Sequence, residues 1–154
     1  VSAMSEFMTG WRDEGAPWHA WMAEVNRARQ LFARLIGAEV REVAVVSCAS
    51  EGAYHIASSL DLKERAEIVS SDMEFPSIAH VWLGQEARGA TVRFADGGMR
   101  PDLPTYSAQI GRRTALVSVP LAGYQDGYLP PVAEVIAAAH AAGALAFVDA
   151  YQAA

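Results

Sequence analysis

Short apolar segments that alternate with helix-forming segments constrain the fold of this chain more than any other feature. The expected strands are residues 42–46, 66–70, 90–94, 114–119 and 144–148, and the expected helices are residues 18–36, about 53–60, 77–88 and 131–142. Strands that are apolar throughout and are separated by helices are typical of a parallel sheet with both faces covered. We therefore expect an α/β fold in which three layers (αβα) are built around a mostly parallel sheet.

Composition limits the class of protein and its partners. A length of 154 residues is normal for one domain, so we expect a single core, and 52% hydrophobic with 19% charged residues is typical of a globular protein. The formal net charge of −6 argues against nucleic acid or an anionic membrane as a partner. No apolar run approaches the roughly 20 residues that span a bilayer, and the N-terminus lacks the pattern of a signal peptide. We expect a cytoplasmic protein.

Both ends of the chain look cut. Residues 1–8 have the spacing of the second half of an amphipathic helix, with no N-cap residue before them. At the other end, residues 144–154 form an apolar strand that continues into a polar loop and stops. We therefore expect the 154 residues to be part of a longer polypeptide.

Ligands of such sheets bind beyond the carboxyl ends of the strands, so the strand-to-helix loops are the first places to look for a site. The loop Ser47-Cys-Ala-Ser-Glu-Gly52 consists mostly of small residues and precedes a helix. Backbone N–H groups at a helix start, together with the Ser50 hydroxyl, suit a phosphate. Alternatively, Ser50 is only an N-cap. For Cys48, a small buried residue is the favoured interpretation, and a reactive thiol is the alternative.

Two further loops carry residues of interest. Phe75 lies between a strand and a helix-starting proline, where it is either a core aromatic or a surface that stacks on a flat ligand. Asp149 follows an apolar strand directly, where a buried carboxylate needs a cation. A surface-exposed Asp149 that closes the strand is the alternative.

Other motifs narrow the chemistry. The chain has neither Gly-x-x-x-x-Gly-Lys nor Gly-x-Gly-x-x-Gly, which disfavours a nucleotide P-loop and a nicotinamide dehydrogenase. A single cysteine excludes an internal disulfide framework and a four-cysteine zinc site. The histidines His19, His55, His80 and His140 are scattered, without ligand spacing to acids, so we expect no metal site.

The ordered set of loops resembles the class V aminotransferase family of fold type I pyridoxal-phosphate enzymes. The most specific piece is Val148-Asp-Ala-Tyr-Gln152, which is similar to the family's "VDAxQ" strand end. Residues 49–52, 74–77, 82–83 and 140–144 support it. The family includes cysteine desulfurases, selenocysteine lyases, kynureninases and members like isopenicillin N epimerase. The resemblance implies the large domain of a fold type I transferase, in part.

The resemblance also implies a role for each matching residue. Ala49 and Ser50 would hold the phosphate of pyridoxal 5′-phosphate, and Phe75 would stack on its pyridine ring. Asp149 would pair with the protonated ring nitrogen, and Gln152 would hydrogen-bond the phenolic oxygen. One cofactor must touch all of them, so we expect these residues to line a single cavity, with Asp149 and Phe75 on neighbouring strand ends.

Two departures from the family pattern bear on the reaction. Desulfurases of the family usually have a histidine at the position of Phe75, and phenylalanine cannot move protons, which favours kynureninase-like or epimerase-like chemistry. Leu121 and Gly123 stand where the family commonly carries a histidine and an amide side chain.

The cofactor-binding lysine of the family follows the Asp149 strand by one more strand, so the resemblance places it beyond the end of the chain. The one lysine present, Lys63, is expected on the surface at a helix end. Residues 1–154 would thus be part of the cofactor-binding large domain, without the N-terminal segment, the lysine-bearing segment and the C-terminal small domain. No catalytic residue is assigned within the chain, and the fragment alone should be inactive.

The resemblance implies that the intact protein is a homodimeric transferase or lyase that acts on an amino acid through an external aldimine. A cysteine desulfurase or selenocysteine lyase is the alternative within the family. A non-catalytic α/β module that binds a phosphorylated ligand is the alternative from another class.

Overall fold

The computed structural model describes residues 1–153, and the chain divides into two compact units, Val1–Val46 and Ser47–Ala154. The first unit contains helices α1 (Ser2–Glu14) and α2 (Trp18–Ile36) and the short 3-10 helix η1 (Val40–Glu42). Rings of Phe7, Trp11 and Trp21 pack together between α1 and α2, with centroids 5.7–5.9 Å apart. The helix predicted over 18–36 is confirmed.

The strand expected at residues 42–46 is absent, so this prediction was wrong. Residues 40–42 are 3-10 helix, and residues 43–46 have no regular structure. The Arg29 guanidinium donates hydrogen bonds to the carbonyl oxygens of Val43 at 2.7 Å and Val40 at 2.8 Å. A β-branched run becomes a strand only with a ladder partner, and here the Arg29 side chain occupies the carbonyl of Val43 and that of Val40 just before the run.

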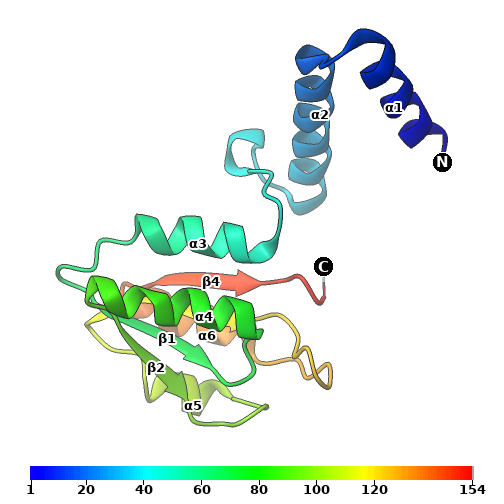
Figure 1. Ribbon diagram of the computed structural model, residues 1–154. Coiled ribbons are helices and arrows are strands. Elements are labelled where there is room, and N and C mark those ends of the chain that lie inside the picture. The colour runs from blue at the N-terminus through cyan, green and yellow to red at the C-terminus, as the bar shows by residue number, and fades with distance from the viewer. Residues whose placement is uncertain (154) are drawn as a thin grey trace. The chain divides into compact units, whose positions relative to one another are not determined.

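The second unit is built on a four-stranded parallel sheet with the order β2-β1-β3-β4. Its strands are β1 (Glu67–Ser71), β2 (Thr91–Ala95), β3 (Thr114–Pro120) and β4 (Leu145–Asp149). Its helices are α3 (Ala49–Ser59), α4 (Pro76–Leu83), η2 (Gly84–Arg88), α5 (Leu103–Ser107) and α6 (Val132–Ala141). The four later strands begin and end within one residue of their predicted bounds, and the parallel α/β fold is confirmed (Figure 1).

Helices cover both faces of the sheet because its inner strands alternate their apolar side chains between the faces. Ile68 and Leu116 pack with α3 and α4 around the buried Trp82. Val69 and Val117 point the other way and pack with α5 and α6. Each inner strand is therefore buried on both sides, and its central residues are apolar.

The sheet order creates a topological switch point beside β1, since β2 lies on one side of β1 and β3 on the other. Loops that leave the carboxyl ends of strands at such a point diverge and open a crevice. Phe75 follows β1, whereas Asp149 ends β4, and β3 lies between these two strands. The expectation that Phe75 and Asp149 follow neighbouring strands was wrong, because sequence patterns do not specify the order of parallel strands.

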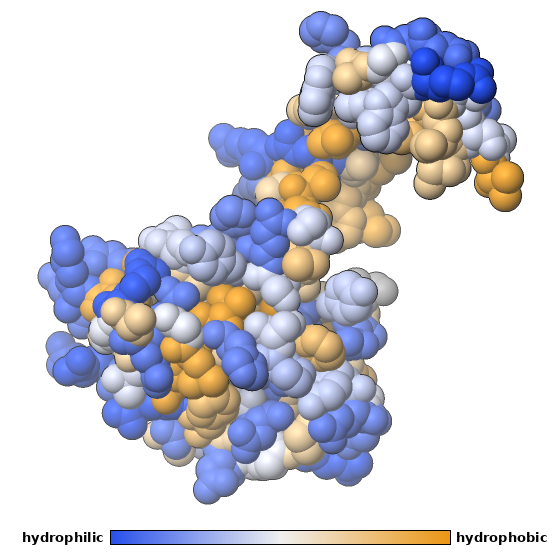
Figure 2. Space-filling view, viewed as in Figure 1, coloured by the Kyte–Doolittle hydropathy of each residue, from blue (hydrophilic) through white to orange (hydrophobic). Residues whose placement is uncertain are grey.

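The first unit keeps many apolar side chains exposed, among them Met8, Trp18 and Leu35. Figure 2 shows hydrophobic (orange) surface on this unit. Within residues 1–46, Ala33 is the one buried apolar side chain. The other buried apolar side chains of the described residues belong to the second unit. No helix in residues 1–153 has the length and apolar character needed to cross a membrane.

Candidate functional site

The start of α3 forms one side of the site. Cys48 is the N-cap, so Ser50 is the second residue of the helix and lies in its first turn. The first N–H groups of a helix have no carbonyl partner within it and point outward with partial positive charge. Glu51 folds back and accepts two hydrogen bonds of 2.6 Å from the hydroxyl and the backbone N–H of Ser47. These bonds fix the loop and lower the pKa of Glu51.

The start of α4 lies beside the start of α3. The Ser50 hydroxyl donates a hydrogen bond of 2.8 Å to the Ser77 hydroxyl. Pro76 begins α4, where its missing N–H is no loss. Phe75 is 39% exposed and lines the pocket, so part of its surface is open to a ligand. The ring of Tyr124 contacts it edge-on, with centroids 5.3 Å apart and an interplanar angle of 79°.

The end of β4 supplies a buried carboxylate. Asp149 is only 8% exposed, and its Oδ1 accepts the backbone N–H of Tyr151 at 3.0 Å. No lysine, arginine or histidine within the described part of the chain forms an ion pair with it. A buried carboxylate without a cation is costly, so this position suits a positively charged ligand group.

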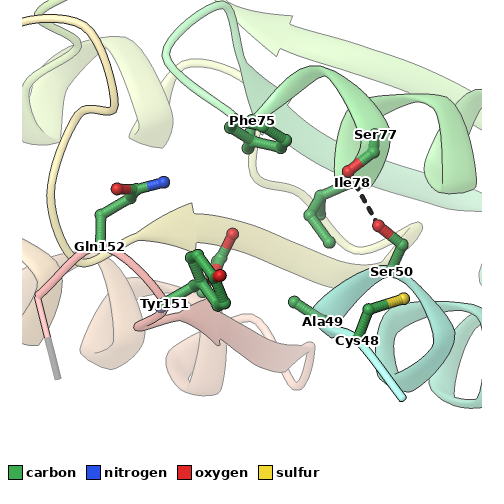
Figure 3. Close-up of a pocket in the computed structure, with 9 residues that line it drawn as sticks. Cys48, Ala49, Ser50, Phe75, Ser77, Ile78, Tyr151 and Gln152 are labelled. Carbon is green, nitrogen blue, oxygen red and sulfur yellow. Dashed lines mark hydrogen bonds between the residues drawn. The ribbon is translucent and has the colours of Figure 1, made fainter. Parts of the chain in front are cut away.

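These groups surround one pocket of about 200 Å³. It is lined by Cys48, Ala49, Ser50, Phe75, Ser77, Ile78, Asp149, Tyr151 and Gln152. Figure 3 shows the two serines at one end of the pocket, Gln152 at the other, and Phe75 across from Tyr151. The structure therefore brings all five sequence-predicted site residues, Ala49, Ser50, Phe75, Asp149 and Gln152, to a single cavity.

The simpler interpretations of these positions do not hold. Ser50 is not the N-cap, because the helix begins one residue before it. Phe75 is not a core aromatic, and Asp149 is not at the surface. The favoured interpretation of Cys48 was also wrong, since its side chain is exposed and lines the pocket.

One buried group beside the pocket was not predicted from the sequence. Glu74 is 3% exposed, and burial, with the negative charge of Asp149 adding to it, raises the pKa of Glu74 to about 7. Its carboxylate accepts hydrogen bonds from the Ser118 hydroxyl and from the backbone N–H of Phe75. The sequence feature that could have indicated this group is the position of an acid between a buried strand and Phe75.

Leu121 and Gly123, which also depart from the family pattern, lie outside the pocket lining. Gly123 is buried, and a Cβ added there would come within 3.1 Å of the Asp126 carboxylate and 3.3 Å of Met73. Leu121 is half-buried. Lys63 is exposed in a turn after α3, as expected, and is not among the pocket residues.

Comparisons with known proteins agree with this architecture. The family model "Aminotransferase class-V" matches residues 3–154. An uncharacterized aminotransferase, YcbU of Bacillus subtilis (strain 168), is 36% identical over 141 residues, covering 92% of this chain and 38% of the relative. A cysteine desulfurase of Gluconacetobacter diazotrophicus is 34% identical over 164 residues, covering 99% of this chain and 41% of the relative. The chain thus spans about two fifths of the length of these relatives.

Solved structures show the same fold. The cystine C–S lyase C-DES, in complex with its product cysteine persulfide, superposes with a TM-score of 0.84 at 22% identity, covering 97% of this chain and 43% of the lyase. A variant of C-DES, with the same TM-score and identity and 42% of its chain covered, carries glycine covalently linked to its PLP cofactor. The fold is that of the fold type I pyridoxal-phosphate enzymes. The chain belongs to the class V aminotransferase family, whose cofactor is pyridoxal 5′-phosphate.

The chemistry of the pocket fits this cofactor. A helix start with outward N–H groups and the Ser50 hydroxyl suit a phosphate. The exposed face of Phe75 suits a flat ring. The unpaired, buried carboxylate of Asp149 suits a protonated ring nitrogen. All three lie around one cavity.

Proposed function

We propose that this chain is the cofactor-binding part of a pyridoxal-phosphate enzyme that acts on an amino acid. The observation that carries the proposal is the convergence of Ser50, Phe75, Asp149 and Gln152, from three separate loops, on one pocket. A single small ligand with a phosphate, an aromatic ring and a cationic nitrogen accounts for this set. Family membership supports the same conclusion.

Each residue has a distinct task in this proposal. Ala49 and Ser50 bind the phosphate through backbone N–H groups and a hydroxyl, and Phe75 supports the ring by stacking. Asp149 keeps the ring nitrogen protonated, and Gln152 donates a hydrogen bond to the phenolic oxygen. When bound, the cofactor supplies an electron-withdrawing ring that stabilises negative charge at the substrate carbon.

The proposed reaction type rests on the lack of a titratable side chain at position 75. Phenylalanine at position 75 has no titratable group, so it takes no part in proton transfer. We propose a transformation of the kynureninase or epimerase type in preference to desulfuration. Desulfuration remains the alternative, because relatives such as that of Gluconacetobacter diazotrophicus are named cysteine desulfurases.

We propose that the lysine that attaches the cofactor lies beyond residue 154, in a segment corresponding to part of the remaining length of the relatives. Lys63 is exposed in a turn and does not line the pocket. Residues 1–154 then form part of the large domain of a homodimer, inactive when isolated. Imine chemistry needs an amine within bonding distance of the cofactor aldehyde.

Cofactor binding tests the proposal directly. Equilibrium dialysis of the purified protein against pyridoxal 5′-phosphate should show saturable binding that Asp149→Asn and Ser50→Ala both weaken. Asp72→Asn, which changes an exposed acid after β1, is the matched control and should bind like the parent. Saturable binding that neither site substitution weakens would overturn the assignment of the pocket.

Turnover of the intact protein then separates the reaction types. The intact protein is incubated with a panel of amino acids that includes cysteine, kynurenine and alanine, and the products are identified. Release of sulfur from cysteine as the dominant activity would favour the desulfurase alternative. Cofactor binding without turnover of any amino acid would favour the non-catalytic module.

A further inference from the structure

Glu74 is a buried acid that none of the roles proposed above uses. It lies in the loop between β1 and α4, directly before Phe75, with 3% of its surface exposed. Its Oε1 accepts the backbone N–H of Phe75 at 3.2 Å. Its Oε2 accepts a hydrogen bond from the hydroxyl of Ser118 on β3. The carboxylate therefore ties the backbone that carries the aromatic ring to the neighbouring strand.

Ser118 extends this connection to α4. Its Oγ accepts the indole Nε1–H of Trp82 at 3.0 Å, and Trp82 is completely buried. With one acceptor position used by the indole, the hydroxyl can donate to an ionised Glu74 or accept from a protonated one. The network satisfies either charge state of Glu74 without moving the backbone.

The surroundings of Glu74 contain acids and phenols rather than cations. The negative charge of Asp149, at the end of β4, repels that of Glu74. Tyr106 of α5 lies close enough for the charge of Glu74 to contribute to the raised pKa of Tyr106. The Tyr106 hydroxyl donates to Ser71 Oγ at 3.0 Å and supplies no positive charge. From β3 and α4 the facing groups are Ser118 and Trp82, which do not titrate. Binding of a cation at Asp149 would therefore favour the ionised form of Glu74.

We propose that Glu74 is a positioning residue for the cofactor ring: it fixes the backbone of Phe75 and adds a second carboxyl group near Asp149. The inference rests on the function proposed above, because it takes the ring nitrogen to lie at Asp149. Glu74 acts through these two residues and does not touch the ligand itself. Its hydrogen bonds orient Phe75, and its charge strengthens the hold on a cationic ring.

The two parts of this role are separable by substitution. Glu74→Gln keeps a carbonyl oxygen for the Phe75 N–H and an amide that donates to Ser118, but it cannot ionise. Glu74→Ala removes the contacts as well as the charge. Glu86→Gln changes an exposed glutamate of η2 and is the matched control.

The measurement is equilibrium dialysis of the purified protein and its variants with pyridoxal 5′-phosphate at pH 6 and pH 8. Comparing parent with Glu74→Gln at each pH cancels the titration of the cofactor itself. At pH 6 the two should bind within about twofold of each other, because Glu74 is then mostly protonated in the free protein. At pH 8 the parent should bind more tightly, by about tenfold if the cofactor lowers the pKa of Glu74 by one unit.

The outcomes distinguish this inference from the proposed function. Glu74→Ala should bind more weakly than Glu74→Gln at both pH values, while Glu86→Gln should match the parent throughout. If the ratio of parent to Glu74→Gln affinity is the same at both pH values, the charge role is overturned. If a folded Glu74→Ala variant, checked by circular dichroism, binds like Glu74→Gln, the orienting role is overturned. If Asp149→Asn weakens cofactor binding in those same experiments, the proposed function stands whatever the result for Glu74.

Discussion

Ser50 and Ser77, 27 positions apart in the chain, join the first turns of α3 and α4 by a hydroxyl–hydroxyl hydrogen bond of 2.8 Å. Both side chains line the pocket between Phe75 and Asp149. Two helix starts therefore present hydroxyl groups and outward N–H groups at the same end of the cavity.

Removing the Ser50 hydroxyl should weaken cofactor binding. A hydrogen bond to a charged group contributes about 1.5–3 kcal/mol, so Ser50→Ala should lower the affinity for pyridoxal 5′-phosphate by about tenfold or more. Dialysis measures the change. Ser58→Ala, at an exposed position of the same helix, is the control and should leave the affinity unchanged. Equal affinities of Ser50→Ala and Ser58→Ala would contradict a phosphate contact at Ser50.

Asp149→Asn should have opposite effects on stability and on binding. Without a ligand, the buried carboxylate has no cation partner among residues 1–153. A neutral amide of the same shape removes that cost, so the free energy of unfolding without cofactor should stay equal or rise. Urea denaturation and dialysis measure the two quantities. A large loss of stability in the cofactor-free variant would show that Asp149 has a structural partner.

The pH dependence of stability should report on Glu74. Its pKa is raised from 4.5 to about 7 in the folded protein, mainly by burial. The folded state therefore binds the Glu74 proton more tightly than the unfolded state does. The stabilisation that results is complete below pH 4.5 and is lost as the pH rises to 7. The loss is at most about 3 kcal/mol.

Urea denaturation of the parent and of Glu74→Gln between pH 4.5 and 8 tests this expectation. The difference in free energy of unfolding, parent minus variant, should fall across this range, because glutamine does not titrate. A difference that is constant with pH, or one that rises, would show that Glu74 is ionised in the folded protein well below pH 7.

Trp82→Phe should destabilise the second unit. The substitution removes the indole N–H that Ser118 accepts at 3.0 Å, and it shrinks the ring that contacts Phe147 edge-on with a centroid distance of 5.1 Å. We expect a loss of about 1–3 kcal/mol in the free energy of unfolding. Trp18→Phe, with a side chain 66% exposed, should change it by less than about 0.5 kcal/mol. Similar effects of the two substitutions would contradict the packing of Trp82.

The four strands of the sheet were predictable because each is an apolar run bounded by helices. The run at 42–46 has the same local character, yet it forms no strand, because a strand also requires a neighbour for its hydrogen bonds. Pairing is a long-range property that local composition does not contain. The order β2-β1-β3-β4 was unpredictable for the same reason.

The site shows the same division. Ser50, Phe75 and Asp149 each follow or precede an element with a recognisable pattern, so their loops were predictable. The environment of Glu74 was not, because its partner Ser118 lies 44 positions away on another strand. An acid in a loop usually faces solvent, and only the packed fold reveals that this one is buried.

The edge-on contact between Phe75 and Tyr124 has a consequence for divergence among related enzymes. Tyr124 belongs to the loop after β3, the same loop in which Leu121 and Gly123 replace residues typical of the family. Substitutions in that loop alter the support of the aromatic ring while leaving the ring itself in place. The orientation of the Phe75 ring, and with it the surface offered to a flat ligand, thus depends on a residue that does not line the pocket.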